Sequence, residues 1–294
     1  MVNMNKALLD VKNKLDEYNQ NPSLLYNGKT PVKNKEPASI VSTTTKEKAK
    51  VPISGLVVMN DKKQEKKLQT DNTKQPVNQH INKNLTNYWP LNGNSNDIRT
   101  NLDLKMCKNS VFTKNGYDGT KALLFKNSYA IAPNGVYFDN DLTISAWVKL
   151  NSLSKASTRL IDFGDEKLTD NVIASLSSDS TGRPYFQVNS NGVQGEPVMS
   201  NIPLEIGKWE HLSFTLKDGR VKIYINGELT ARGYTQIPRN VQRTSNLIGI
   251  RNGLTSKEEI ANNRCDFEIM DLKFFSKALN QFDVISAMTD RFSK

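Results

Sequence analysis

The chain has 294 residues, a formal net charge of +10 at pH 7 and a hydrophobic fraction of 37%. This length allows one large domain or two ordinary ones, and it suffices to bury a core without help from metals or disulfides. No apolar run approaches the length of a bilayer-spanning helix, so we expect no membrane span.

The basic charge is concentrated in the N-terminal third of the chain. Residues 1–84 contain fifteen Lys, no Arg and eight acidic residues, and therefore carry +7 of the total of +10. Charged residues interrupt the apolar residues near the N-terminus, so the hydrophobic region of a signal peptide does not form. We therefore expect an intracellular protein, or one built into a particle such as a virion, rather than a secreted protein.

Residues 5–19 are predicted to form a short amphipathic helix. Spacings of three, four and three place four residues on one face, namely Leu8, Val11, Leu15 and Tyr18. A helix of this length is not stable alone in water. It either docks onto a protein partner or another copy of the chain, or packs on its own domain.

Residues 20–84 have the composition of a disordered tether, because Lys, Asn, Gln, Thr and Pro are abundant and aromatic residues are almost absent. One apolar segment, Val51–Met59, either adds a strand to a partner's sheet or covers an edge of the adjoining domain. The run of residues 62–67 contains four lysines but no Arg and no interleaved aromatic residue. We interpret it as a solvated tail rather than a nucleic-acid site.

Residues 85–294 have the pattern of an all-β domain. Alternating apolar and polar residues in Trp209–Glu228 meet at two turn dipeptides, Asp218-Gly219 and Asn226-Gly227. Such dipeptides supply the positive φ angles of tight hairpins, so three consecutive antiparallel strands are predicted. Further strands are expected at Tyr88–Leu91, Ala122–Phe125, Tyr129–Ala132, Leu142–Leu150, Leu160–Phe163, Val172–Leu176, Tyr185–Val188, Leu247–Ile250 and Phe267–Phe275.

Many short strands with regular turns predict a two-sheet antiparallel sandwich. One helix is expected near the C-terminus, with Ser276 as its N-cap and an apolar face made of Leu279, Phe282, Ile285 and Met288. The two cysteines, Cys107 and Cys265, are no disulfide framework. They form a single bridge if the end strands bring them together, or they remain two buried free thiols.

An ordered set of motifs runs through residues 85–294. It comprises Tyr88–Gly93, Ala122–Phe125, Leu142–Lys149, Leu160–Gly164, Lys208–Leu212, Val221–Gly227 and Asp271–Leu279. This set resembles a jelly roll of the concanavalin A-like lectin/glucanase superfamily, of the laminin G and pentraxin type. The resemblance implies neighbouring N- and C-terminal strands, and binding of glycans, proteins or lipids, often with calcium. Asp266-Phe267-Glu268 departs from the family pattern, which has a small Gly there.

Sugar-cleaving relatives use two carboxylates that face each other across the scissile bond. Laminarinase-like members place them in a Glu-x-Asp-x-x-Glu arrangement on one strand. Here Glu268 and Asp271 are three residues apart, and regular alternation places their side chains on opposite faces. The one histidine of this domain, His211, has no Ser-Gly elbow nearby. We therefore expect a non-enzymatic protein, with glycoside hydrolysis as a minor alternative.

The candidate ligand site is the polar side of the strands, which also carries Lys149 and Trp209. Aromatic rings surrounded by hydroxyl and cationic groups suit a sugar, whose apolar face stacks while its hydroxyls form hydrogen bonds. The alternative is that a loop, the final helix or the N-terminal tail covers this face. The candidate ligand-binding residues are Trp147, His211, Tyr224, Lys222, Ser213 and Thr215.

Asp139 and Asp141 offer clustered oxygen ligands for calcium, and Asp162 and Asp165 offer a second pair. The alternative is that these are ordinary turn residues. The sequence thus predicts a non-enzymatic jelly-roll module, which residues 1–84 tether to protein partners in a larger assembly such as a virion. A lectin-like, glycan-binding protein is the alternative.

Overall fold

A computed structural model describes residues 81–107, 110–254 and 265–290 of the chain. The helix expected at 5–19 and the apolar segment Val51–Met59 lie outside the described residues.

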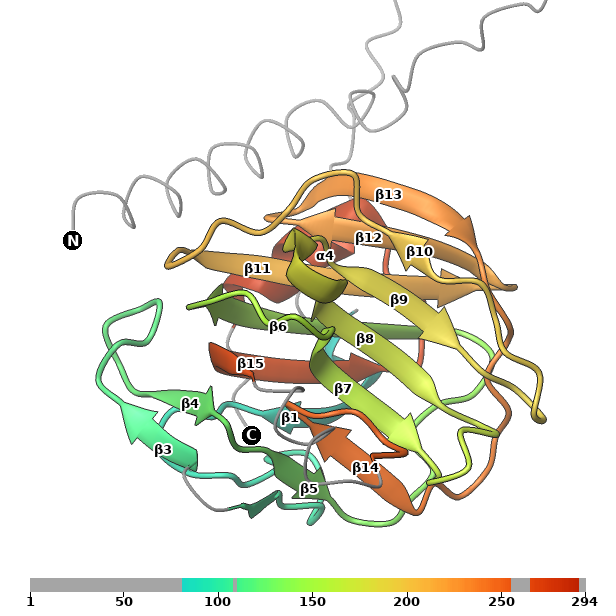
Figure 1. The fold of residues 1–294 in the computed structure, drawn as a ribbon, viewed down its shortest axis with the longest axis horizontal. Coiled ribbons are helices and arrows are strands. Elements are labelled where there is room, and N and C mark those ends of the chain that lie inside the picture. Colours follow the sequence, from blue (N-terminus) through green and yellow to red (C-terminus); the bar gives the residue numbers. More distant parts are fainter. Residues whose placement is uncertain (1–80, 108–109, 255–264, 291–294) are drawn as a thin grey trace, which may run out of the picture.

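The described residues form two antiparallel sheets packed face to face, which is the predicted jelly-roll sandwich (Figure 1). The strands of sheet A are β1 Leu85–Trp89, β3 Ser110–Thr113, β4 Ala122–Lys126, β6 Leu142–Leu150, β11 Trp209–Lys217, β12 Arg220–Ile225, β13 Glu228–Tyr234 and β15 Asp266–Phe275. Those of sheet B are β2 Lys105–Met106, β5 Ala130–Ala132, β7 Thr158–Gly164, β8 Val172–Ser177, β9 Tyr185–Val188, β10 Val198–Met199 and β14 Ser245–Ile248. A short 3-10 helix, Asp179–Thr181, joins β8 to β9.

Within sheet A the strand order is β13-β12-β11-β6-β15-β4-β3, and β1 also pairs with β15. Within sheet B the order is β10-β9-β8-β7-β14-β5-β2. The pairing of β1 with β15 joins the first and last strands of the described residues, with Leu85 opposite Phe275. This is the neighbouring arrangement of terminal strands that the resemblance implied.

The two hairpins that follow β11 form at the predicted dipeptides. Asp218 and Gly219 have φ angles of 50° and 75°, and Asn226 and Gly227 have φ angles of 52° and 79°. Two successive positive φ angles give a turn whose twist matches that of the flanking strands. The strands β2 and β10 were not predicted, because segments of two residues are too short to show a period, and the four-residue β3 was not predicted either.

The core lies between the two sheets, and we call the opposite side of each sheet its outer face. On β6 the core residues are Leu142, Ile144, Ala146 and Val148, as alternation predicts. Aromatic rings fill the centre of the core: Phe274 contacts Trp89 edge-on at a centroid distance of 5.1 Å and Phe163 at 5.4 Å. Burying each such side chain stabilises the fold by about 1.5–3 kcal/mol.

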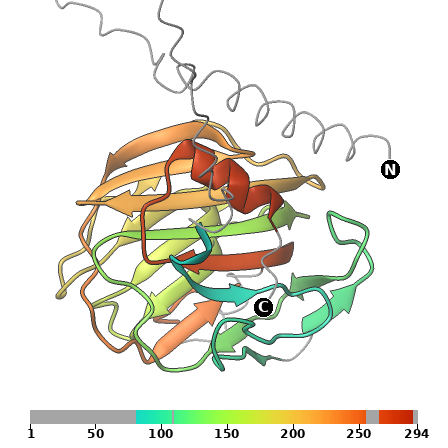
Figure 2. The same ribbon diagram turned by 180° about the vertical axis from the view of Figure 1, so that it is seen from behind.

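Helix α4, Gln281–Thr289, lies across the outer face of sheet A (Figure 2). Its N-cap is Asn280, whose Oδ1 accepts a hydrogen bond from the Asp283 amide at 3.0 Å. The prediction of Ser276 as the N-cap is wrong. The Ser276 amide donates to the Asn84 carbonyl at 2.9 Å and so extends the contact of β15 with β1. None of the helices in the described ranges is long and apolar enough to span a membrane.

Cys107 and Cys265 are both free thiols, so the alternative of a bridge is not realised. The Cys107 amide bonds to the Tyr129 carbonyl beside sheet B. Cys265 precedes β15 of sheet A, and its thiol donates to the Ser128 carbonyl at 3.0 Å. Burial raises the pKa of the Cys265 thiol to about 11, which makes it a poor nucleophile.

Candidate functional site

The aromatic platform predicted from alternation lies on the outer face of sheet A, but helix α4 closes it. Trp147, His211 and Tyr224 are only 7%, 1% and 2% exposed, and Ser213 and Thr215 are buried as well. The Trp147 indole Nε1 donates to the Met288 carbonyl of α4 at 3.2 Å. Of the predicted ligand residues only Lys222 is exposed. The expectation of an open platform is therefore wrong, and the alternative of a covering helix holds.

A buried lysine fastens the C-terminal end of α4 to the sheet. The Lys273 Nζ donates to the carbonyls of Ala287 and Asp290, each at 2.8 Å, and lies 5.1 Å from the centre of the Tyr88 ring. A cation at the last carbonyls of a helix complements the helix dipole. Burial, and secondarily Lys273, holds the pKa of His211 well below its ordinary value. This imidazole is therefore neutral under the helix at pH 7.

The carboxylates of Glu268 and Asp271 on β15 do not lie on opposite faces, contrary to the sequence expectation. The pairing of β15 with β6 shifts between Met270 and Lys273, and Asp271 has a φ angle of 52°. This β-bulge adds one residue to the alternation, so that Ile269 and Leu272 both enter the core. Asp271 consequently shares the outer face with Glu268. Asp266-Phe267-Glu268, where the chain departs from the family pattern, forms the regular start of β15.

Hydrogen bonds from neighbouring side chains occupy both carboxylates. The Asp271 carboxylate accepts hydrogen bonds from the Tyr88 hydroxyl at 2.7 Å and the Tyr117 hydroxyl at 2.8 Å. Glu268 accepts one from the Thr113 hydroxyl at 2.6 Å and forms an ion pair with Lys149. Both acidic residues are almost fully buried. Each carboxylate thus serves to join strands and loops.

Beyond the reach of α4, one cross-strand row on this face remains partly open. The row crosses β11, β6, β15, β4 and β3 in register, and we call it the Trp209 row; its members are Trp209, Lys149, Glu268, Leu124 and Val111. The Val111 residue is 50% exposed and the Lys149 side chain 16%. Trp209 and Leu124 are half-buried. An aromatic ring, an ion pair and an aliphatic surface therefore lie side by side at the end of the sheet.

Contacts from three directions hold the Trp209 indole in place. Its Nε1 donates to the Asn115 carbonyl at 2.8 Å, and the Lys149 Nζ lies 5.5 Å from the ring centre. The Tyr117 ring meets Trp209 edge-on at 6.3 Å and stacks on Trp147 at 4.3 Å. Tyr117 thereby separates the sealed platform from the partly open row.

The sequence placed Trp209 and Lys149 on the correct side of their strands, but neither was among the predicted ligand-binding residues. Glu268 joins them because the register of three strands brings it opposite Lys149. Thr113 comes from β3, a strand that was not predicted. Trp209 and Lys149 become neighbours only through the pairing of β11 with β6, which links segments about sixty residues apart. The sequence carries no local signal for that pairing.

The calcium candidates do not converge on a common centre. The Asp139 carboxylate accepts hydrogen bonds from the Asn140 amide at 2.9 Å and from Asn240 Nδ2 at 3.1 Å. Within residues 81–107, 110–254 and 265–290, no group of three or more acidic, His or Cys residues is placed to hold a metal ion. The structure brings no third ligand of these types to Asp139 and Asp141 in those ranges.

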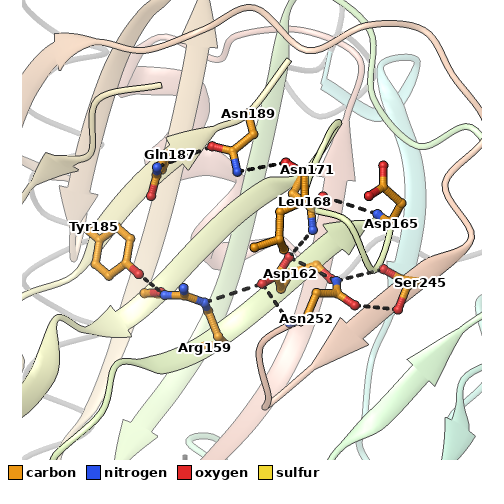
Figure 3. A network of polar contacts seen from close by, with 11 residues as sticks. Arg159, Asp162, Asp165, Leu168, Asn171, Tyr185, Gln187, Asn189, Ser245 and Asn252 are labelled. Atoms are coloured by element: carbon orange, nitrogen blue, oxygen red, sulfur yellow. Dashed lines mark hydrogen bonds and ion pairs between the residues drawn. The ribbon is translucent and has the colours of Figure 1, made fainter. Parts of the chain in front are cut away.

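The other candidate pair, Asp162 and Asp165, belongs to a polar network on the outer face of sheet B (Figure 3). Asp162 is buried, and its carboxylate accepts hydrogen bonds from Asn171 Nδ2 at 2.7 Å, the Asn252 amide at 3.1 Å and Asn252 Nδ2 at 3.1 Å. Asp165 instead accepts from the Thr169 amide at 3.1 Å. The two carboxylates therefore serve separate turns.

Arg159 extends this network toward β8 and β9. Its Nη1 donates to the Ser175 Oγ at 2.7 Å and to the Tyr185 hydroxyl. The guanidinium carbon lies 5.3 Å from the centre of the Tyr185 ring. Burial lowers the pKa of the Arg159 guanidinium, because removing the group from water disfavours its charged form.

Comparisons with known proteins agree with this architecture. Residues 125–285, more than half of the chain, match the family model of the concanavalin A-like lectin/glucanases superfamily. The chain belongs to this superfamily. A search of curated proteins found no match. Residues 1–124 precede the matched region, so β1, β2, β3 and β4 up to Leu124 lie ahead of it.

Solved structures with the same fold are distant in sequence. One is domain 4 of an extracellular arabinanase from Geobacillus stearothermophilus, in complex with arabinotriose, with a TM-score of 0.56, 19% identity, and coverage of 69% of this chain and 97% of that domain. Another is the binding domain of Paraclostridial Mosquitocidal Protein 1, with a TM-score of 0.53, 17% identity, and coverage of 70% of this chain and 52% of that one. A third is the receptor-binding domain of botulinum neurotoxin type G, with a TM-score of 0.53, 16% identity, and coverage of 69% of this chain and 50% of that one. The chain spans about half the length of the two toxin domains.

Proposed function

We propose that this protein is a non-enzymatic binding module that recognises carbohydrate at the Trp209 row. The observation that carries the proposal is the half-buried Trp209 ring beside the Lys149–Glu268 ion pair. An indole accepts the apolar face of a sugar, and the neighbouring Lys149 ammonium, which Glu268 holds in place, donates to its hydroxyls. The aliphatic side chains of Leu124 and Val111 extend the row beyond the ion pair.

The state of the carboxylates supports a binding rather than a hydrolytic role. A glycosidase needs one carboxylic acid and one carboxylate that both reach the scissile bond. Glu268 and Asp271 are buried, and Lys149, Thr113, Tyr88 and Tyr117 hold them. The likeness of the fold to a domain solved with arabinotriose supports carbohydrate as the ligand class.

The test is a glycan array probed with the full chain and with Trp209→Ala, followed by titration calorimetry with any oligosaccharide that binds. We expect Trp209→Ala to weaken binding about tenfold or more, and Trp209→Phe to retain most of it, because a phenyl ring still stacks. Tyr234→Ala is the matched control, since Tyr234 is an aromatic residue that is 68% exposed on β13. Equal binding by Trp209→Ala and the wild type, or binding of no glycan by either, would refute the proposal.

A second candidate function is tethering to a larger assembly such as a virion. The pairing of β1 with β15 joins the two ends of the described sandwich, and residues 1–80 precede it in the sequence. We propose that these residues bind protein partners in that assembly. Deleting residues 1–80 should leave the thermal unfolding of the domain nearly unchanged and remove the protein from the particle fraction in sedimentation. A truncated chain that unfolds, or that still sediments with the particle, would contradict this.

A further inference from the structure

We propose that the end of sheet A beside the Asp218-Gly219 turn docks onto an anionic lipid surface. We call this region the Lys222 patch, and all of its members are exposed: Lys217, Arg220, Lys222, Arg232, Tyr234 and Ile237. The proposal is independent of the Trp209 row. Lys217 and Trp209 lie at opposite ends of the nine-residue strand β11, about 26 Å apart.

The register of β11, β12 and β13 places the four cations of the patch in like-charge pairs. Lys217 lies opposite Arg220 in the pairing of β11 with β12. Lys222 lies opposite Arg232 in the pairing of β12 with β13. Like charges directly opposite each other destabilise a sheet. An anionic partner that contacts both pairs would relieve this repulsion.

Few carboxylates oppose these charges. In the part of the chain that the structure describes, the one ion pair of the patch joins Arg220 to Asp218 at 3.7 Å, with side chains 61% and 66% exposed. An exposed pair of this kind contributes at most about 1 kcal/mol. Next to the patch, Asp141 precedes β6 and Lys277 lies at Thr143, and these two charges cancel. Four cations and one anion leave the patch with a net charge of +3, as much as residues 85–294 carry in total.

Two exposed apolar side chains border the cations. Tyr234 is 68% exposed and lies opposite Arg220. Ile237 is 43% exposed, and it lies beside the turn because the Thr235 amide donates to the Gly219 carbonyl at 3.0 Å. Binding at a membrane interface gains from buried apolar area and from the attraction of cations to anionic lipids. The patch offers both.

A lipid surface fits this combination better than a soluble polyanion does. Each Lys or Arg near an anionic membrane contributes about 1 kcal/mol of attraction. A tyrosine ring lodges at the level of the headgroups, and an aliphatic side chain reaches the acyl boundary. A polysaccharide or a nucleic acid would contact the cations but leave Ile237 in water. Residues 1–84 carry a charge of +7, so the patch repels them as an occupant.

Flotation of the full chain with lipid vesicles tests the proposal. The probes are vesicles of phosphatidylcholine alone and of phosphatidylcholine mixed with phosphatidylserine. We expect binding only to the mixed vesicles, and we expect raised salt to weaken it. Because residues 1–84 are also basic, the variants must compare equal losses of charge.

The informative variant combines Lys222→Gln with Arg232→Gln and should weaken vesicle binding about tenfold or more. The matched control combines Lys62→Gln with Lys63→Gln, which removes the same charge from the run of residues 62–67. We expect a clearly smaller loss from this control. Equal losses from the two variants, or equal binding to both kinds of vesicle, would overturn the proposal.

A second variant tests the apolar contribution at constant charge. Tyr234→Ser combined with Ile237→Ser should also weaken vesicle binding, while glycan binding at the Trp209 row stays unchanged because that row lies at the other end of β11. Soluble heparin and single-stranded DNA are the competing probes. If either binds more tightly than the mixed vesicles and the Ser variant binds vesicles as well as the wild type does, the patch recognises a soluble polyanion and the lipid proposal fails.

Discussion

The Nζ of Lys273 lies under helix α4 and donates a hydrogen bond to the Ala287 carbonyl at 2.8 Å. A second bond of the same length reaches the Asp290 carbonyl, so one buried ammonium group binds two carbonyls at the end of the helix. This contact joins β15 to the element that seals the outer face of sheet A. It turns what alternation predicts to be an open surface into a second, smaller core.

Replacing Lys273 with Met should loosen α4. The variant keeps an unbranched side chain but loses two charge-assisted hydrogen bonds and leaves carbonyls without a donor, so we expect a loss of about 2–4 kcal/mol. Urea unfolding measures the loss, and hydrogen exchange should show faster exchange of α4 amides than of sheet B amides. Lys217→Met, at an exposed position at the end of β11, is the control and should change stability by less than about 0.5 kcal/mol. Equal effects of both substitutions would contradict the role of Lys273.

Asp271 should tolerate Asn far better than Val. Its φ angle of 52° lies in the left-handed region, which Asn adopts readily and a β-branched residue does not. Val would also leave the Tyr88 and Tyr117 hydroxyls without their acceptor. We expect Asp271→Val to cost about 3 kcal/mol or more, and Asp271→Asn about half as much, in chemical denaturation. Similar losses for the two variants would show that the bulge carries no backbone constraint.

The buried His211 should make stability depend on pH below neutrality. Its pKa in the folded state is held well below the ordinary value of 6.5. The unfolded state therefore binds more protons than the folded state once the pH falls below about 6.5, and stability decreases by up to about 1.4 kcal/mol per pH unit. His211→Gln should have a flatter profile between pH 7 and pH 5 in urea unfolding. A variant with the same slope as the wild type would assign the dependence to other groups.

Cys265 should be inert toward thiol reagents in the folded protein. Its pKa is raised to about 11, so the reactive thiolate is scarce at pH 8, and the residue is buried. Cys107 is half-buried and should react first. Alkylation with iodoacetamide followed by mass spectrometry should label Cys265 only after denaturation. Labelling of Cys265 as fast as Cys107 under native conditions would contradict its placement.

Much of the fold could be predicted because its signals are local. Each dipeptide at the ends of β12 imposes its own positive φ angles, whatever surrounds it. Alternation within β6 and β11 likewise identifies the core side of each strand. The bulge at Asp271 escaped prediction because it arises from the pairing of β15 with β6. The correct cap of α4 was missed because Ser276 still bonds to Asn84 across the sheet.

The candidate site shows the same division. The sequence by itself determined the hairpins, the jelly-roll sandwich and the outward side that Trp147, Trp209 and Lys149 share. Only the tertiary structure decided that Trp147 is sealed by Met288 while Trp209 stays partly open beside Glu268. The physical reason is the sequence distance over which each interaction acts. A strand sets the direction of its side chains through its own backbone geometry, whereas a side chain is covered by segments that lie more than a hundred residues away in the sequence.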